Sequence, residues 1–474
     1  MKPRFLQPSL FNRVFGVVLV LWVTTVAFAA NPIPSVVGPV RPQAVVPGSG
    51  DFTLTVYGAN FVQGAVVNWN RQPRHTTFIS ARELHALVLA SDVEQPTAGF
   101  VTVTNPAPGG GVSSSSHGLV EVHVPTTTMV LNRPHVYIGG YSTLIADFNN
   151  DGKPDLAGGY GEEEIPVWLG EGDGTFQRGS IATQNYFSSG GIAYGDFNGD
   201  GNADLVFQAG PFGPPTQLQV NLGDGNGKFH LGSRFGNFVA GGSFSEISVG
   251  DFNRDGKLDI AAGEDPSPSV FLGNGDGTFQ PRKRYQPRGA SVPITGDFNG
   301  DGKLDLVAIL SHQLYLLLGN GDGTFQKPIK LSASIESCGF GPTLFVDDFN
   351  GDGNLDLAFC DKARIGILLG RGDGTFEEPV FYATGSVFYT VGVGDFNSDG
   401  KTDLLVSREV NQQAQLILLL GNGDGTFQRG RLIELPGNYY GETGILATDF
   451  DSDGLLDFAL QLPSGVSAAV YTQK

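Results

Sequence analysis

The chain contains few of the residues that redox proteins and disulfide-rich proteins depend on. It has 2 Cys, 2 Met and 3 Trp among 474 residues. Cys338 and Cys360 permit either one disulfide or two buried thiols, because sequence does not fix the Cα separation that a disulfide needs. One bridge in a chain of this length would not be its main source of stability.

Positive charge is also scarce. The chain has 29 Lys and Arg against 48 Asp and Glu, for a formal net charge of −19. Proteins that bind nucleic acid need a basic surface that neutralises phosphates. We therefore expect no nucleic-acid partner.

Helical periodicity and recognisable catalytic groupings are missing as well. No long segment repeats apolar residues every three or four positions, whereas 69 Gly and many other turn residues recur throughout. Short strands joined by tight turns, and so an all-β fold, are predicted. No Ser/His/Asp spacing or nucleophile elbow occurs, and we predict no catalytic residue.

The first 30 residues have the organisation of a secretory signal peptide. Lys2, Arg4 and Arg13 precede an apolar run at 14–26, and a small-x-small cleavage site follows at 27–29. The run is short for a membrane span, and an uncleaved anchor is the alternative. We expect an exported protein, secreted or associated with the cell surface, with no membrane span once the signal is removed.

Residues 31–124 form a first unit of about 90 residues. Segments 52–56, 66–69 and 100–104 alternate apolar and polar residues as half-buried strands do, and Gly-rich turns separate them. A small β-sandwich is predicted.

This unit resembles the IPT/TIG family of immunoglobulin-like domains. The matching residues are the turn at 58–61, the strand at 67–70, the pair Thr77 and Phe78, and the segment 101–106 with the Gly run after it. The resemblance implies an immunoglobulin-like sandwich that acts as a spacer or interaction module.

Residues 125–474 contain a nine-residue pattern, Asp-Phe-Asn-x-Asp-Gly-x-x-Asp, seven times. Successive copies are 49, 55, 46, 51, 47 and 54 residues apart. A period near 50 fits one four-stranded propeller blade, and seven copies predict a seven-bladed β-propeller. The copies begin at Asp147, Asp196, Asp251, Asp297, Asp348, Asp395 and Asp449.

Each copy places carboxylate or amide oxygens at positions 1, 3, 5 and 9 and a Gly at position 6. This spacing of hard oxygen donors around a sharp turn is typical of a loop that wraps one Ca²⁺. The sites offer no thiolate or imidazole, which disfavours softer metals. The alternative is that Asp and Asn only cap turns by bonding their own backbone.

A second pattern, Gly-x-Gly-Asp-Gly-Thr-Phe, recurs in register with the first. Copies begin at Gly170, Gly273, Gly319, Gly370 and Gly421, and a variant begins at Gly223. It suits a tight hairpin whose Phe packs between neighbouring sheets. The seventh unit lacks this turn, and residues from 129 onward are expected to supply its outer strand and so close the ring.

The two patterns together resemble FG-GAP/VCBS repeats, the bacterial relatives of the N-terminal β-propeller of integrin α subunits. The resemblance implies that Ca²⁺ is bound by the side chains at positions 1, 3, 5 and 9 and by the carbonyl at position 7. The implied side-chain ligands are Asp147, Asn149, Asp151, Asp155, Asp196, Asn198, Asp200, Asp204, Asp251, Asn253, Asp255, Asp259, Asp297, Asn299, Asp301, Asp305, Asp348, Asn350, Asp352, Asp356, Asp395, Asn397, Asp399, Asp403, Asp449, Asp451, Asp453 and Asp457.

These features predict a secreted calcium-binding propeller, with up to seven structural Ca²⁺ ions. It would act as a binding or adhesion module for an extracellular protein or polysaccharide, and we expect a monomer. Segments 211–215 and 332–342 are the expected variable surface, because loops on a rigid scaffold usually carry recognition. The alternative is a propeller-based polysaccharide lyase or hydrolase.

Overall fold

The computed structural model describes most of the chain from Ala30 to Lys474. The described residues are 30–38, 40–113, 118–127, 129–137, 142–159, 164–182, 187–209, 216–238, 247–263, 268–286, 291–335, 344–361, 363–383, 388–410, 413–433, 435, 444–462 and 467–474. The predicted signal peptide, Cys338 and segments 211–215 and 336–342 lie outside them.

The first described unit is a β-sandwich, which we call the sandwich. One sheet has the order β1 (Ser35–Val36), β3 (Phe52–Ala59), β7 (Glu83–Val88), β6 (Thr76–Ser80). The other has the order β2 (Ala44–Val45), β10 (Leu119–Val122), β8 (Thr97–Asn105), β4 (Val66–Trp69), β5 (Gln72–Pro73), with β9 (Gly111–Val112) on β8. A short 3₁₀ turn, η1 (Ala90–Asp92), follows β7.

The alternation predicted for the first unit explains its core. Inward residues of both sheets, such as Leu54, Val67 and Val103, are fully buried in one cluster around Trp69. Two sheets that share one core in this way form a β-sandwich. Its membership of the IPT/TIG family stays a prediction.

The rest of the chain folds into seven four-stranded antiparallel sheets, numbered here 1 to 7. Sheet 1 contains β12 (Ser142–Ala146), β13 (Asp155–Gly159), β14 (Pro166–Gly170) and β15 (Phe176–Ile181). Sheet 2 contains β16 (Phe187–Gly195), β17 (Asp204–Ala209), β18 (Thr216–Gly223) and β19 (Phe229–Phe238). Sheet 3 contains β20 (Ile247–Gly250), β21 (Asp259–Ala262), β22 (Ser269–Phe271) and β23 (Lys283–Arg284).

The later sheets repeat this plan. Sheet 4 contains β24 (Ser291–Gly296), β25 (Asp305–Leu310), β26 (Gln313–Leu317) and β27 (Ile329–Ser334). Sheet 5 contains β28 (Leu344–Asp347), β29 (Asp356–Asp361), β30 (Arg364–Leu368) and β31 (Val380–Ala383). Sheet 6 contains β32 (Phe388–Gly394), β33 (Asp403–Val410), β34 (Gln413–Leu419) and β35 (Arg431–Ile433).

The fourth strand of sheet 7 comes from residues 135–137, which precede sheet 1 in the sequence. Sheet 7 contains β36 (Gly444–Thr448), β37 (Asp457–Leu462), β38 (Ser467–Tyr471) and β11 (His135–Tyr137), in that order. β11 pairs with β38 in antiparallel register, from His135 opposite Val470 to Tyr137 opposite Ala468. The prediction that residues from 129 onward supply the outer strand of the seventh unit is therefore confirmed.

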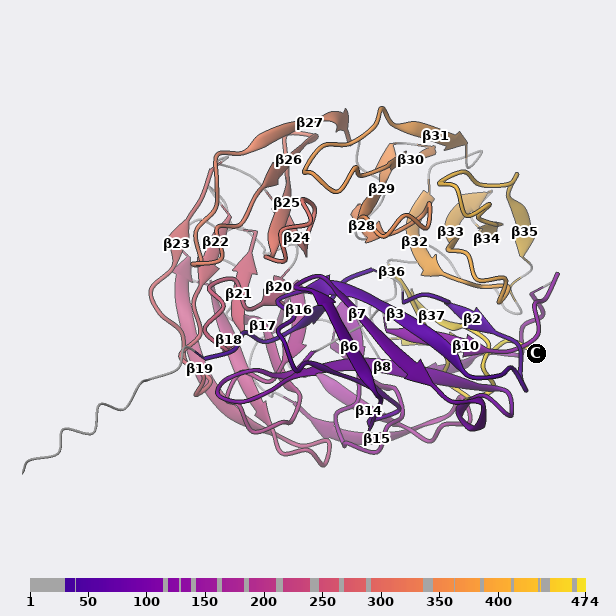
Figure 1. Ribbon diagram of the computed structural model, residues 1–474, viewed down its shortest axis with the longest axis horizontal. Helices are drawn as coiled ribbons and strands as arrows, with labels where there is room; N and C mark the ends of the chain where they lie inside the picture. Colours follow the sequence, from indigo (N-terminus) through magenta and orange to yellow (C-terminus); the bar gives the residue numbers. More distant parts are fainter. Residues whose placement is uncertain are drawn as a thin grey trace, which may run out of the picture.

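The sheets stand around a ring (Figure 1), and neighbouring sheets pack face to face. The first strands lie innermost, because β12 contacts β16, β16 contacts β20, β20 contacts β24 and β32 contacts β36. Second strands such as β17 and β29 are buried along their whole length, which explains the apolar runs at 205–207 and 357–360. Sheets 7 and 1 share a cluster that contains Leu156, Phe176 and Phe450, so packing also continues across the join.

A backbone hydrogen bond connects each Gly-Asp-Gly turn to the sheet before it. In six sheets the last Gly of that turn donates to the carbonyl of the Phe at position 2 of the preceding sheet's Asp loop, at 3.0 to 3.1 Å. The pairs are Gly174 with Phe450, Gly227 with Phe148, Gly277 with Phe197, Gly323 with Phe252, Gly374 with Phe298, and Gly425 with Phe349. The Phe of each turn also contacts the Phe of that loop, with ring centroids 5.5 to 6.1 Å apart.

Sheet 7 has no Gly-Asp-Gly turn, and Gln473 replaces it. The Gln473 amide nitrogen Nε2 donates to the carbonyl of Phe396 at 3.3 Å and to that of Leu456. Phe396 is the position-2 residue of the sixth loop, so this side chain supplies the seventh inter-sheet bond. Gln473 is buried and bridges to Leu131, just before β11.

We predict that Gln473→Ala destabilises the ring. The substitution leaves two buried carbonyls without their donor, at a cost of about 2 kcal/mol. Chemical denaturation at saturating Ca²⁺ measures the change in free energy of unfolding. The exposed Gln428 is the matched control, since Gln428→Ala should stay within about 0.5 kcal/mol. Equal stability of the two variants would contradict this role of Gln473.

Candidate metal centres in the aspartate loops

The seven Asp patterns, called loops 1 to 7 from Asp147 onward, occupy the same place in every sheet. Each loop connects the first strand to the second, and its ninth residue begins the second strand, as Asp155 begins β13. Because the strands are antiparallel, the Gly-Asp-Gly turn between strands three and four lies at the same end of the sheet. All seven loops therefore gather at one end of the ring.

The carboxylate at position 1 organises each loop by accepting bonds from the loop's own backbone. In loop 1, Oδ1 of Asp147 accepts from the amide of Asp151 at 3.1 Å and Oδ2 accepts from Gly152 at 2.8 Å. Gly152 has a φ of 88°, in the left-handed region that Gly adopts at least cost. The same pair of bonds from positions 5 and 6 recurs in loops 2 to 6.

Positions 3 and 5 turn their oxygens toward the same concave side. Oδ1 of Asn149 accepts from the amide of Asp151 at 3.1 Å, and Oδ1 of Asp151 accepts from Lys153 at 2.9 Å. The position-5 to position-7 bond is present in all seven loops. The residues that the sequence predicted at positions 3 and 5 thus accept the same backbone bonds in loops 1 to 6. Among the described residues, only loop 7 brings three carboxylates, those of Asp449, Asp451 and Asp453, within 4.8 Å of one another.

The Asp at position 9 links its loop to the turn between strands three and four. Its Oδ2 accepts from the position-2 amide at 2.8 to 3.1 Å in every loop. Its Oδ1 accepts at 2.7 to 2.8 Å from the Gly that opens the Gly-Asp-Gly turn, as Gly170 donates to Asp155. In sheet 7 the amide of Gln473 takes that place on Asp457.

The position-9 carboxyls are fully buried, and this raises their pKa values. Burial is the largest cause, the neighbouring Asp carboxylates of the same loop add to it, and the two amide bonds oppose it. The pKa rises from 3.8 to about 7 for Asp155, Asp204 and Asp305, to about 8 for Asp259 and Asp356, and to about 9 for Asp403 and Asp457. A buried cluster of like charges of this kind is costly unless a cation compensates it.

Loop 7 differs from the others because Asp451 replaces Asn at position 3. The carboxylates of Asp449, Asp451 and Asp453 lie within 4.8 Å of one another. Oδ1 of Asp451 is buried and accepts no hydrogen bond. Burial, followed by repulsion from Asp453, raises the pKa of Asp451 to about 6.

The residues present fit a hard divalent cation. The donor set of each loop is carboxylate and amide oxygen. In loop 7 three carboxylates converge, and Asp451 contributes a buried oxygen that no protein donor satisfies. The carboxylates also cap their own turns, as the alternative from sequence proposed. Capping occupies one lone pair per oxygen and leaves others available, so the two roles are compatible.

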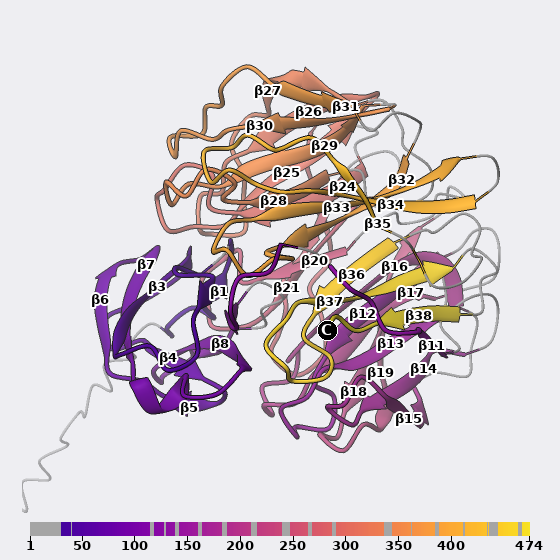
Figure 2. The ribbon, with the colours of Figure 1, turned by 90° about the vertical axis from the view of Figure 1, so that its right-hand side faces the viewer.

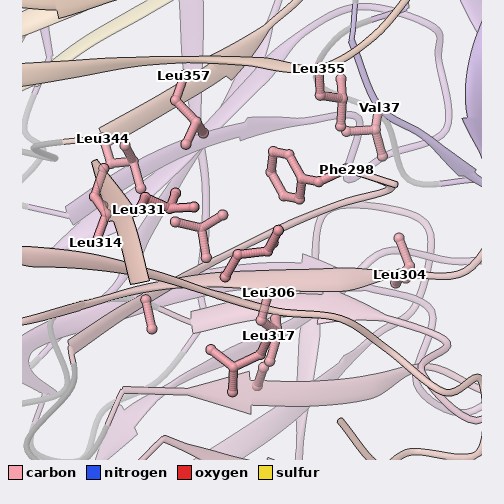
Figure 3. Packing of buried hydrophobic residues seen from close by; sticks show 14 of the residues in the cluster. Val37, Phe298, Leu304, Leu306, Leu314, Leu317, Leu331, Leu344, Leu355 and Leu357 are labelled. Atoms are coloured by element: carbon pink, nitrogen blue, oxygen red, sulfur yellow. The ribbon is translucent and has the colours of Figure 1, made fainter. Parts of the chain in front are cut away.

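The sequence did not reveal that the sandwich lies on the loop end of the ring (Figure 2). Arg41 forms an ion pair with Asp348 of loop 5 at 3.2 Å, Arg82 donates to Gly353 and Arg71 pairs with Asp147. Figure 3 shows Val37 of the sandwich beside Leu355 of loop 5, within one buried cluster. In the sequence, Arg41, Arg71 and Arg82 are only isolated basic residues in an acidic chain. Such a pattern does not predict where the sandwich docks.

A surface hollow of about 360 Å³ lies between sheets 2 and 3. It is lined by Phe235, Gly236, Phe271, Phe279, Gln280, Pro281 and Arg282. None of these is a carboxylate, imidazole or hydroxyl that could act as an acid, base or nucleophile. Cys360 is buried in β29, and the choice between disulfide and thiol stays open because Cys338 lies outside the described residues. Among the described residues, no helix is long and apolar enough to cross a membrane.

Comparison with solved structures finds chains that are similar to this one at low sequence identity. A lectin from Agrocybe aegerita that recognises non-reducing terminal N-acetylglucosamine has 19% identity and a TM-score of 0.48, covering 84% of this chain and 99% of its own. An auxiliary nutrient-binding protein from Bacteroides ovatus has 12% identity and a TM-score of 0.41, covering 93% and 98%. A rhamnogalacturonan lyase from Bacillus licheniformis has 12% identity and a TM-score of 0.42, covering 94% and 91%.

No functionally characterised protein in the curated comparison matches the sequence. The model of the FG-GAP-like repeat matches residues 147–207, 251–308, 297–345, 348–406 and 395–460. These matches cover more than half of the chain and coincide with the Asp loops and the strands that follow them. The chain therefore belongs to the FG-GAP-like repeat family.

Proposed function

We propose that this protein is an exported, calcium-stabilised β-propeller of seven blades that binds an extracellular protein or polysaccharide. The observation that carries the proposal is the repetition of one buried carboxylate geometry in seven loops. Each loop concentrates three or four Asp side chains, and the described ion pairs, from Arg41, Arg71, Lys257, Lys303 and Lys401, reach one carboxylate each in five of the loops. The proposed role of Ca²⁺ is to neutralise these charges and hold the turns, so that its binding energy becomes folding energy.

The residues of each loop would supply the oxygen atoms that hold the ion. The side chains at positions 1, 3 and 5, such as Asp147, Asn149 and Asp151, would hold the ion together with the position-7 carbonyl of Lys153. Asp155 would complete the site while keeping its two amide bonds to the backbone. The ion supplies the positive charge that makes the ionised form of these carboxyls favourable.

The proposed ligand surface is the end of the ring away from the loops, because the sandwich occupies the loop end. Connections between second and third strands reach that far end, as the turn between β25 and β26 does at Ser311 and His312. Both residues have positive φ, which fixes a tight, projecting turn. Export through cleavage of residues 1–30 and a monomeric state complete the proposal.

The proposed Ca²⁺ role predicts an unusual pH dependence in excess chelator. An Asp whose pKa is raised from 3.8 to about 7 to 9 in the fold binds more protons folded than unfolded. Its stability contribution is complete below pH 3.8 and is lost as the pH rises through the folded value. We expect the metal-free protein to melt several degrees lower at pH 8 than at pH 5.5.

Calcium should remove this effect, since the bound ion favours the ionised carboxyls. Thermal unfolding at both pH values, with excess Ca²⁺ and with excess chelator, measures the four melting temperatures. Magnesium at the same ionic strength is the control for screening by salt. Identical melting temperatures with Ca²⁺ and with chelator at pH 8 would refute a structural role for the ion.

The binding role predicts specific retention of a ligand by the Ca²⁺-loaded chain. Screening against arrays of glycans and extracellular proteins should give a signal that survives moderate salt. Incubation with acidic polysaccharides, followed by assays for new reducing ends and unsaturated products, tests the alternative of a lyase or hydrolase. We expect no products, and catalytic turnover would replace the binding proposal with the enzymatic one.

A further inference from the structure

The sandwich contacts the loops unequally, and this divides them into two groups. The position-1 carboxylates of loops 3 to 7 are at most 5% exposed, whereas those of loops 1 and 2, Asp147 and Asp196, are half-buried. The seven loops share one internal geometry, so the loop itself does not produce the difference. The two groups of loops differ in how much of each loop the sandwich covers.

The space around the glycines at position 6 shows how closely the sandwich approaches each loop. A Cβ built on Gly256 of loop 3 would lie 2.6 Å from the carbonyl oxygen of Asn31, and one on Gly454 of loop 7 would lie 2.6 Å from that of Thr97. On Gly302 of loop 4 it would lie 2.5 Å from a side chain of the sandwich, Ala81. Backbone and side chains of the sandwich therefore rest directly on these turns.

Loops 1 and 2 have no such cover at this position. A Cβ on Gly152 or Gly201 would meet nothing within 4 Å. The sandwich reaches loop 1 through Arg71, a long side chain that is itself 49% exposed and pairs with Asp147. Such a contact can open by rotation of one side chain, without movement of the domain.

Hydrogen bonds hold the cover over loops 3 and 4. The amide of Ile33 donates to Oδ2 of Asp251 at 2.9 Å, and Nδ2 of Asn60 donates to the carbonyl of the same Asp251 at 2.9 Å. The amide of Asn60 donates to the carbonyl of Gly302 at 2.9 Å. Asn60 is fully buried between the two units.

Loops 5 and 6 are held in the same way. Nη2 of Arg41 donates to the carbonyl of Asp348 at 2.8 Å, in addition to its ion pair with that carboxylate. The amide of Thr126 donates to the carbonyl of Asn397 at 2.8 Å. Nε2 of Gln43 donates to Thr402 at 3.0 Å, so loop 6 is covered beside its open Gly400.

The contact leaves little room for solvent. The hollow between the sandwich and loops 4 and 5 measures about 10 Å³, roughly the space of one water molecule. Its lining includes Asp297, the position-1 ligand predicted for loop 4, and Tyr57 and Arg82 of the sandwich. This hollow is too small to hold a hydrated ion.

We infer that the seven cation sites form two kinetic classes, with loops 1 and 2 open to solvent and loops 3 to 7 covered at position 1 by the sandwich. The inference rests on the proposed function, which places Ca²⁺ in the loops. Ions in loops 1 and 2 exchange directly with the medium. In loops 3 to 7 the sandwich covers the position-1 side of each site, while the position-5 carboxylates Asp301 and Asp352 stay exposed. Ions therefore leave these five loops more slowly than loops 1 and 2 when external Ca²⁺ falls.

Stopped-flow release of Ca²⁺ into an excess of a fluorescent chelator tests the inference on the full chain. We expect two phases with amplitudes in the ratio of two ions to five, the slower at least about tenfold slower, equivalent to ~1.4 kcal/mol. A single phase that releases all seven ions would overturn the two classes and leave the proposed calcium sites intact. Absence of any chelatable Ca²⁺ from the purified protein loaded with the ion would instead refute the proposed function.

Variants of the sandwich test whether it closes the slow sites. Arg41→Ala with Arg82→Ala removes two side chains that contact loop 5 without altering any predicted ligand. We expect the slow phase to accelerate several-fold and the fast phase to keep its rate. Arg74→Ala is the matched control, because Arg74 pairs with Asp92 inside the sandwich at 2.7 Å.

The control should release Ca²⁺ as the original protein does, and circular dichroism verifies that both variants are folded. An unchanged slow phase in the folded double variant would overturn the closing role of the sandwich. Should the double variant not fold, Arg82→Ala alone gives the same comparison, since it removes the donor to Gly353 while the contact from Arg41 remains.

Discussion

The fold depends on one buried carboxylate per sheet, the Asp at position 9 of each loop. This side chain joins the turn between strands one and two to the turn between strands three and four. In sheet 1, Asp155 does so through Phe148 and Gly170, at 2.8 Å each. Close approach is possible because the turn begins with Gly: a Cβ on Gly170 would lie 2.2 Å from the carbonyl oxygen of Pro154. The same buried charge makes each sheet dependent on compensation, which links the fold to the chemistry of the loop.

Sheets are joined to one another by the same turns. The Gly at the end of each Gly-Asp-Gly turn bonds to the preceding loop, and the Phe after it packs on that loop's Phe. In sheet 7 different residues make the same bonds. The backbone amide of Gln473 donates to the carboxylate of Asp457, and its side-chain amide donates to the carbonyl of Phe396. A single Gln therefore performs the roles that a Gly-rich turn has in the other six sheets.

The position of the sandwich decides which loops of the ring are open to solvent. It covers most of the loop end, and its Arg41, Arg71 and Arg82 face an acidic surface. Polar contacts to loop backbone, such as Asn60 to Gly302, require the loops to be formed already. The geometry of the loops, the position of the sandwich and the solvent accessibility of the loop carboxylates are therefore coupled.

Much of this could be predicted from the sequence because it is local or repeated. Strand alternation gave β3 and β4, the seven Asp patterns predicted seven equivalent loops, and the missing last turn predicted the pairing of β11 with β38. Each of these depends on spacing along the chain, which fixes which side chains share a turn or a face.

The sequence by itself determined the all-β class, the repeat, and the donor set of each loop. Only the tertiary structure decided that Gln473 bonds to Phe396, that the sandwich rests on loops 3 to 7, and that loops 1 and 2 stay open. These contacts join residues separated by up to several hundred positions, such as Arg41 and Asp348, and no local pattern encodes them. They follow from the shapes and charges of two folded surfaces, which exist only after each unit has formed.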